Sequence, residues 1–200
     1  MRWKKNRVLT LKLRNGHYAV VQMLEEKNWL AVFNLFLNDL DCSEVSLVEA
    51  EILFVTHIST TVLKHSELEE LINIDPKLDI SIPKYTIHIG SGFRKVSLWE
   101  NTNDPVSLLL LGEGVNRLYR TGRENGALFE EFLDFEGNKD EYELNNLSVY
   151  PNFNERLLLC EHYGKNFDPF KELAFNNELE AVCRTSVKIM SGIDIKKVGY

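Results

Sequence analysis

The sequence predicts an α+β protein with an N-terminal twisted antiparallel β-sheet of the SH3-like, half-barrel kind, further strands in the second half, and a few short helices. Three short β-prone runs follow one another within the first third of the chain, further runs of this kind recur in the second half, and helix signals are confined to short segments. The 200 residues, 44% of them hydrophobic, are enough for a core without disulfides. We expect one domain over residues 1–200, in which 1–75 and 83–200 form two subdivisions.

Four runs of apolar and β-branched residues predict the N-terminal sheet. They are residues 8–13, 17–24, 29–33 and 50–58. The first two flank Asn15-Gly16, a dipeptide typical of hairpin turns. The first three runs are joined by turns too short for parallel crossovers, so we expect an antiparallel meander. The fourth run is apolar on both faces, which predicts a strand buried in the sheet.

A helix is expected directly after this sheet. Ser66 and Glu69 have the spacing of a capping box, which predicts that Ser66 is the N-cap. Leu68, Leu71 and Ile72 then fall on one helical face. The helix should stop before Pro76.

The second half restarts with strands and ends with helices. We expect strands at 85–89, 95–99 and 106–111, the last of them fully apolar in character and therefore buried. A helix is predicted from an N-cap at Asn154 to a stop at Gly164. Asp168-Pro169 predicts a second helix start, and residues 187–198 a last strand.

Charge is distributed unevenly along the chain. The formal net charge is -7. The first fourteen residues contain six basic side chains and no acid, whereas 124–143 contain eight acids and one lysine, Lys139. Nucleic acid is a poor partner for the acidic stretch because its phosphates would be repelled. A basic protein would be attracted to it.

Aromatic residues are interleaved with these acids. Phe129, Phe132 and Phe135 recur every third residue, which fits an amphipathic helix with its aromatic side chains in the core. The alternative is a protein interface, in which the acids steer a basic partner and exposed aromatics anchor it. The candidate partner-binding residues are Glu130, Glu131, Asp134, Glu136, Asp140, Glu141 and Glu143.

Motifs for catalysis, cofactors or metals are missing. Neither Gly90-Ser91-Gly92 nor Gly112-Glu113-Gly114 extends to a phosphate-binding pattern, and no GxSxG elbow or CxxC pair occurs. We therefore expect a protein that is not an enzyme and needs no cofactor. The alternative is a metal-dependent phosphoester hydrolase in which His57, His65 and His88 converge.

Residues 1–33 have a recognisable order of features. A basic lead-in and a strand precede the hairpin sequence at 13–24, and a hydrophobic strand at 30–33 ends in Phe33. This order resembles the opening of the immunity protein 26 family. The resemblance implies a bacterial protein that neutralises a cognate polymorphic toxin, such as a nuclease with a basic active face, by binding it.

The expected function is therefore that of an immunity protein that occludes a basic toxin through an acidic surface. A regulatory protein- or peptide-binding β-barrel is the remaining alternative. The three cysteines are few and widely spaced, and no signal-peptide or membrane-spanning run is present, so we expect a cytoplasmic protein without a membrane partner.

Overall fold

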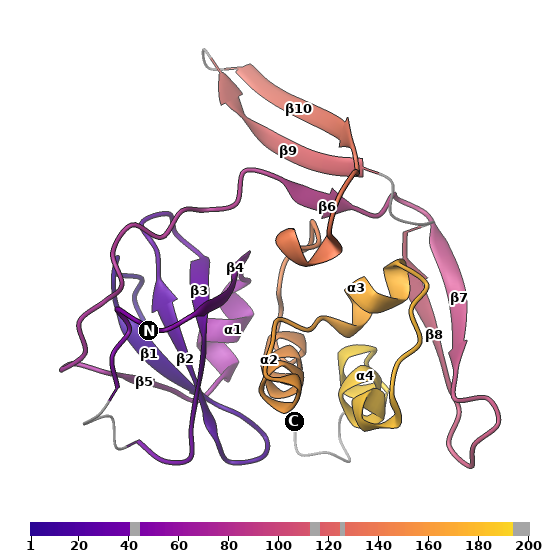
Figure 1. Ribbon diagram of the computed structural model, residues 1–200, viewed down its shortest axis with the longest axis horizontal. Coiled ribbons are helices and arrows are strands. Elements are labelled where there is room, and N and C mark those ends of the chain that lie inside the picture. The colour runs from indigo at the N-terminus through magenta and orange to yellow at the C-terminus, as the bar shows by residue number, and fades with distance from the viewer. Residues whose placement is uncertain (41–44, 113–116, 125–126, 194–200) are drawn as a thin grey trace.

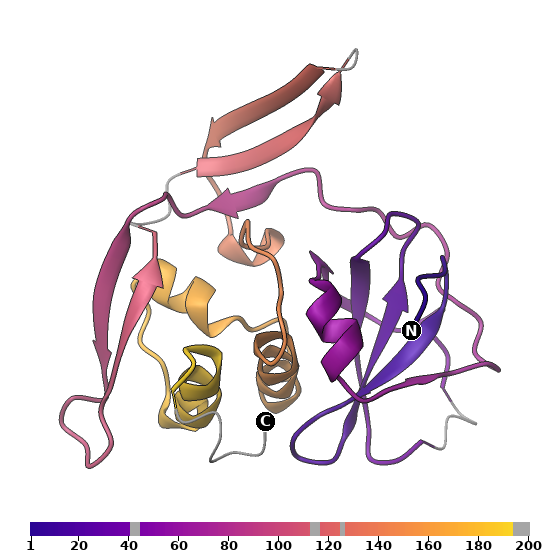
Figure 2. The same cartoon turned by 180° about the vertical axis from the view of Figure 1, so that it is seen from behind.

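The computed structural model describes residues 1–40, 45–112, 117–124 and 127–193 (Figure 1). Its strands form a 5-stranded, a 3-stranded and a 2-stranded sheet, and every strand pairing in them is antiparallel. Short helices lie between the first sheet and the last one (Figures 1 and 2). The predicted α+β class is confirmed.

The N-terminal sheet contains the four predicted strands and one more. The strands are β1 (Val8–Lys12), β2 (Tyr18–Met23), β3 (Trp29–Leu37), β4 (Ile52–His57) and β5 (Leu68–Glu70), in the order β4-β3-β2-β1-β5. The predicted hairpin is present: the Leu13 N–H donates to the His17 carbonyl at 2.7 Å across the turn. Gly16 has φ +92° there, a conformation that glycine adopts without steric cost.

The helix predicted from Ser66 is wrong. Helix α1 (Thr60–His65) is capped by Ser59 and ends at Ser66, whose hydroxyl donates to Asn154 Oδ1 at 2.9 Å. Leu68, expected on a helix face, lies in β5 opposite Leu11 of β1. Pairing with the free edge of β1 and packing of Leu68 on the core outweigh the local capping pattern.

The second half contains the predicted strands and a long hairpin. Its strands are β6 (Thr86–His88), β7 (Phe93–Leu98), β8 (Val106–Leu111), β9 (Arg117–Glu124) and β10 (Ala127–Asp134). They pair in the orders β10-β9-β6 and β7-β8. Strand β8 was expected to be buried, but only alternate residues are, and Leu109 and Leu111 face outward. A two-stranded sheet is covered on one face only, which explains the difference.

Helices fill the space between the sheets. They are η1 (Lys139–Glu141), α2 (Asn152–Tyr163), α3 (Pro169–Ala174), η2 (Ala181–Cys183) and α4 (Arg184–Met190). The predicted stop of α2 at Gly164 (φ +61°) is confirmed, and so is the cap of α3, where Asp168 accepts from the Phe170 N–H at 2.9 Å. Pro151, rather than Asn154, precedes α2.

The predicted last strand is wrong where the structure describes it. Residues 187–190 lie in α4, whose Val187 and Ile189 are buried. Residues 191–193 form no strand either, and the last part of that prediction, 194–198, lies outside the described residues. Among the described residues, no helix is long and apolar enough to cross a membrane.

Helix α2 is shared by two cores. Phe153, Leu157 and Cys160 pack with Leu9 and Leu11 of the first sheet. On its other side, Leu159 packs with β8, α3 and α4. Since one helix serves both cores, the first sheet and the second half are held together along it (Figure 2).

Candidate protein-binding surface on the β9–β10 hairpin

The acidic stretch begins in a β-hairpin that projects from the rest of the protein (Figures 1 and 2). The amphipathic helix expected for Phe129, Phe132 and Phe135 is therefore wrong, because β10 pairs with β9 along its whole length. Successive side chains of a strand point to opposite faces. The spacing of three thus places Phe129 and Phe132 on opposite faces of the hairpin.

One face of the hairpin carries a cluster of three rings. The Phe132 ring lies 5.1 Å from Tyr119 and 5.3 Å from His88, measured between centroids. The Tyr119 hydroxyl donates to Glu130 at 3.0 Å. Phe132 is nevertheless 42% exposed, and Leu128, two residues before Glu130 on the same face, is 74% exposed.

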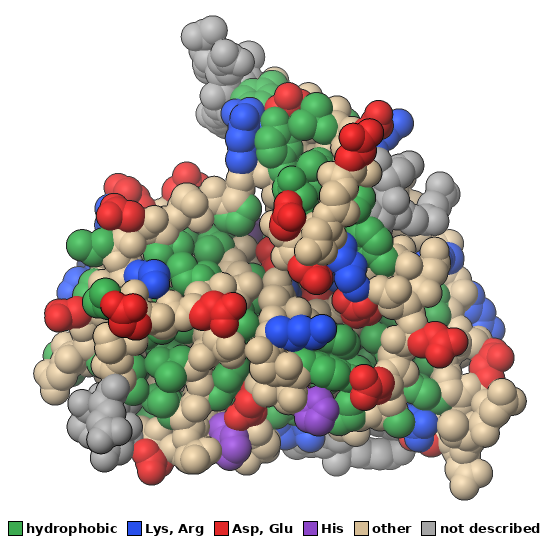
Figure 3. Space-filling model, viewed as in Figure 1, with side chains coloured by type: hydrophobic (Ala, Val, Ile, Leu, Met, Phe, Trp, Pro, Cys, Tyr) green, Lys and Arg blue, Asp and Glu red, His purple; other side chains and the backbone are tan. Residues whose placement is uncertain are grey.

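The opposite face combines charge and aromatic surface. The Arg120 guanidinium lies 5.0 Å from the Phe129 ring centroid and 3.4 Å from the Glu131 carboxylate. The Tyr85 hydroxyl donates to the same carboxylate at 3.0 Å. Leu133, the next residue on this face, is 42% exposed. Large apolar side chains are thus exposed on both faces of the arm, and Figure 3 shows hydrophobic surface on the side of the arm that faces the viewer.

Arginines of β9 face the carboxylates of β10. Glu131 is the register partner of Arg120, and Asp134 is that of Arg117. Glu130 and Glu131 point to opposite faces, since they are neighbours in a strand. The hairpin is therefore mixed in charge, and its strand portion does not gather the predicted acidic side chains on one face.

Unpaired negative charge is concentrated at the base of the hairpin. We call this group the basal carboxylates. They are Asp134, Glu136, Asp140 and Glu141. All are exposed, and none forms an ion pair with another described residue. The one lysine in the stretch, Lys139, is bound to Glu172 of α3.

Glu143 is buried, so its assignment to a partner-binding surface is wrong. It is 7% exposed, lies 2.6 Å from Arg156 of α2, and accepts a hydrogen bond from Asn166 at 2.8 Å. Burial disfavours its charged form, but Arg156 and Lys171 outweigh that effect and lower the pKa of Glu143. The Glu143 carboxylate therefore serves the fold, because it joins Arg156 and Asn166 in the interior.

The three candidate metal-binding histidines lie against different rings. The ring of His57 is 5.4 Å from Trp29, that of His65 is 5.6 Å from Tyr150, and His88 belongs to the hairpin cluster. Within the described ranges no group of three His, Cys, Asp or Glu side chains is placed to hold a metal ion. Cys160 and Cys183 are buried free thiols, and Cys42 lies outside the described residues.

The ring cluster was missed from the sequence. The available signal was the order of residues 128–134, in which pairs of apolar residues alternate with acids, so that each face of a strand would carry both kinds of side chain. Tyr119 and His88 lie far from Phe132 along the chain, so only the pairing of β6, β9 and β10 brings them together.

The fold and this surface define an α+β protein with a projecting, partly apolar hairpin. The chain matches a family described as a domain of unknown function (DUF8309) over residues 1–179, and it belongs to that family. Comparisons with curated proteins and with solved structures gave no match. The resemblance of residues 13–33 to the immunity protein 26 family stays a prediction.

Proposed function

We propose that the protein acts by binding another protein through the β9–β10 hairpin and the basal carboxylates. The exposure of Leu128, Phe132 and Leu133 on the two faces of one arm carries the proposal. Large apolar side chains exposed on a projecting arm are disfavoured in water and are common at protein interfaces. A partner that covers the arm would remove these side chains from water and use the Tyr119–Phe132 ring cluster as an anchor.

The chemistry of the surface favours a cationic partner. The basal carboxylates carry four negative charges that form no ion pair with a described residue, whereas Glu131 of β10 forms one with Arg120. Exposed unpaired carboxylates raise the rate at which a basic protein associates. The apolar arm then supplies the contacts that slow its dissociation.

The particular role that we propose is that of a toxin-neutralising immunity protein. The resemblance in the N-terminal quarter supports it, and an inhibitor with a protruding arm and a negative base suits the basic active face of a nuclease toxin. Occlusion requires no catalytic group on the inhibitor.

Co-purification with the product of the neighbouring gene tests the role. A stable complex, with loss of the toxin's activity, is expected, and failure of the two proteins to associate contradicts the immunity role. The surface is tested in that complex by Phe132→Ser combined with Leu133→Ser, which should accelerate dissociation roughly tenfold or more. The matched control is Ile72→Ser with Leu78→Ser, two exposed apolar residues away from the hairpin.

Charge reversal tests the basal carboxylates separately. Asp140→Lys with Glu141→Lys should slow association and weaken its dependence on salt, because the steering charge is inverted. Glu178→Lys with Glu180→Lys makes the same change in net charge at exposed positions elsewhere. Equal association rates for the two double variants would show that the basal carboxylates do not steer the partner.

A further inference from the structure

A groove of about 520 Å³ lies along strand β8. Five consecutive residues of this strand, Ser107–Leu111, line it on one side. The rest of the lining is mostly apolar and includes Ile89 directly after β6, Phe170 of α3 and Ile193 after α4. Among the described residues, none of the β9–β10 hairpin and none of the basal carboxylates lines the groove, so an activity of this site goes beyond the function proposed above.

One backbone edge of β8 is unpaired. The strand pairs with β7 on one side, and its other side lies toward α3 and α4 (Figures 1 and 2). The Gly112 N–H donates to the Gly92 carbonyl at 2.6 Å, and every second residue before Gly112 turns its backbone toward β7 in the same way. The residues between them therefore direct their N–H and C=O groups to the free edge, where no described residue pairs with them. They are Ser107, Leu109 and Leu111.

The two strands of this sheet differ in how their edges are protected. Strand β7 contains Arg94 and Lys95, and basic side chains of this kind keep an edge strand from pairing with another chain. Strand β8 (Val106–Leu111) contains neither a charged residue nor a proline, and its register with β7 has no bulge. An unpaired edge without any of these features is a ready template for an added strand.

The lining of the groove restricts what can enter it. No charged side chain of the described residues lines it, although 26% of the chain is charged. A charge on an entering segment would lose its water without gaining a partner, which is costly. On the outward face of β8, Leu109 is 72% and Leu111 46% exposed, so apolar surface continues beside the groove. The groove therefore matches an uncharged, apolar segment.

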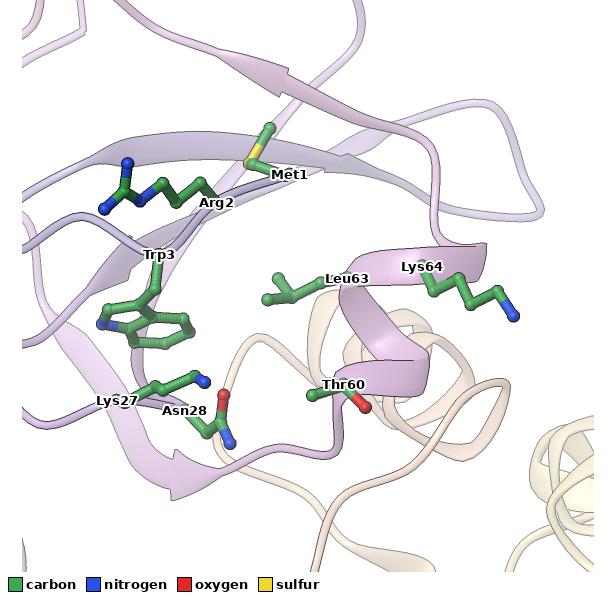
Figure 4. A pocket seen from close by; sticks show the side chains of 8 residues that line it. All are labelled: Met1, Arg2, Trp3, Lys27, Asn28, Thr60, Leu63 and Lys64. Atoms are coloured by element: carbon green, nitrogen blue, oxygen red, sulfur yellow. The ribbon is translucent and has the colours of Figure 1, made fainter.

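A second pocket lacks this combination of features. It has a volume of about 600 Å³ and lies between the N-terminal arm, the β2–β3 turn and helix α1 (Figure 4). The Arg2 and Lys64 side chains at its rim extend in opposite directions, so these cations do not converge on one ligand (Figure 4). The groove along β8, in contrast, places unpaired backbone donors and acceptors beside an apolar wall.

We propose that the groove binds an extended, uncharged, apolar segment of a partner protein, which adds to β8 as a further strand. The N–H and C=O groups of this segment pair with those of Ser107, Leu109 and Leu111. Its side chains alternate between the two faces of the enlarged sheet, so that one set packs on apolar residues of the groove such as Phe170 and Ile193. Main-chain hydrogen bonds provide affinity, and the apolar lining selects the sequence.

Selection of phage-displayed random heptapeptides on the full chain tests the proposal. The enriched peptides should be uncharged and carry apolar residues at alternate positions, and a synthetic peptide of an enriched sequence should bind one to one in calorimetric titration. Absence of any enriched sequence overturns the proposal. Enrichment of charged peptides alone overturns the match between the segment and the lining.

Two proline variants locate the bound peptide. Leu109→Pro removes an N–H that faces the groove, keeps the hydrogen bonds to β7, and should weaken the selected peptide roughly tenfold or more. The matched control is Lys95→Pro, because Lys95 is the register partner of Leu109 and its N–H faces the outer edge of β7. This variant should bind the peptide unchanged. Equal losses in the two folded variants, as judged by circular dichroism, place the peptide elsewhere and overturn the proposal.

Modified peptides test strand addition on the natural chain, whether or not the proline variants fold. Only every second N–H of an added strand faces β8. Methylation of one alternate set of peptide nitrogens should therefore weaken binding roughly tenfold or more, and methylation of the other set should have little effect. Equal losses for the two sets overturn the pairing with β8.

Light scattering tests the alternative occupant, a second copy of the chain. The natural chain should be monomeric if the edge is reserved for a partner's segment. A dimer that Leu109→Pro dissociates and Lys95→Pro leaves intact would show that β8 pairs with a second copy, and would overturn the proposal.

Discussion

Glu143 and Arg156 form an ion pair of 2.6 Å in the interior, with side chains only 9% and 5% exposed. Glu143 ends the acidic stretch, and Arg156 lies in α2, where its guanidinium is 3.8 Å from the Phe54 ring centroid of β4. One contact therefore joins the segment below the projecting hairpin to the helix shared by both cores and to the first sheet. The segment that follows the hairpin is therefore attached to the protein interior through Glu143.

Loss of the Glu143 charge should destabilise the protein strongly. Glu143→Gln leaves Arg156 buried without this partner, and we expect the free energy of unfolding at pH 7 to fall by about 3–5 kcal/mol. Urea denaturation followed by circular dichroism measures the change. Glu141→Gln, an exposed neighbour, should stay within about 0.5 kcal/mol of the natural chain. Equal stabilities of the two variants would contradict the role of the buried pair.

The contribution of this pair should disappear in acid. The folded-state pKa of Glu143 lies below its ordinary value of 4.5. A carboxylate with a depressed pKa stabilises the folded state above its unfolded pKa, and this stability is lost as the pH falls through the folded pKa. The stability gap between the natural chain and Glu143→Gln should thus be constant near neutrality and shrink below about pH 4.5. A gap that persists unchanged into strong acid argues against ionised Glu143.

The Arg14–Glu155 pair should stabilise the contact between the first hairpin and α2. Arg14 donates to both carboxylate oxygens of Glu155, at 3.0 and 3.1 Å, and the Glu155 side chain is fully buried. Arg14→Met should lower the free energy of unfolding by about 2–4 kcal/mol because it takes this cation from a buried carboxylate.

The control for Arg14 is the exposed pair of Lys12, at the end of β1, and Glu67, just before β5, which are 3.0 Å apart. Lys12→Met should lower the free energy of unfolding much less than Arg14→Met does, since water screens exposed ion pairs. Thermal unfolding of both variants measures the difference. An equal loss for both would show that burial of Glu155 adds nothing.

Alanine substitution at two glycines with similar φ should distinguish the cost of backbone strain from the cost of steric crowding. Gly112 has φ +96°, and a Cβ there would lie 2.2 Å from the Ile89 carbonyl oxygen, whereas Gly16 has φ +92° with open space around it. Gly16→Ala should cost about 1–2 kcal/mol from strain alone. Gly112→Ala should cost more than about 3 kcal/mol, since the β6–β7 connection must move. Denaturant titration measures the free energy of unfolding of both variants. Equal losses would contradict the close approach of Gly112 to the Ile89 carbonyl.

The apolar side chains of the hairpin should contribute little to stability. Leu128 is 74% exposed, so Leu128→Ser should change the free energy of unfolding by less than about 0.5 kcal/mol. Leu118, on β9, is buried against Ile87 and Leu144, and Leu118→Ser should cost about 2–5 kcal/mol. Urea denaturation of the two variants measures the difference in their free energies of unfolding. A large loss for Leu128→Ser would mean that this residue serves the fold instead of a partner.

Some elements were predictable because their signals are local. The β1–β2 hairpin follows from Asn15-Gly16 between two β-prone runs, and the start of α3 follows from Asp168-Pro169, where the cap and the first turn involve neighbours only. The capping-box pattern at Ser66 is equally local but failed, because β1 offered an open edge with which Leu68–Glu70 could pair. Edge pairing depends on a strand more than fifty residues away, so no local pattern reveals it.

For the candidate surface, too, some features could be predicted from the sequence and others depend on the fold. The α+β class, the N-terminal antiparallel meander and the concentration of negative charge between 124 and 143 could all be predicted from the order of the residues. The positions of those charges in space follow from the folded chain, which places Glu131 opposite Arg120, Glu143 in the interior against Arg156, and the basal carboxylates in water. Charge along a chain is additive, but charge in space depends on which distant segments the folded backbone places beside it.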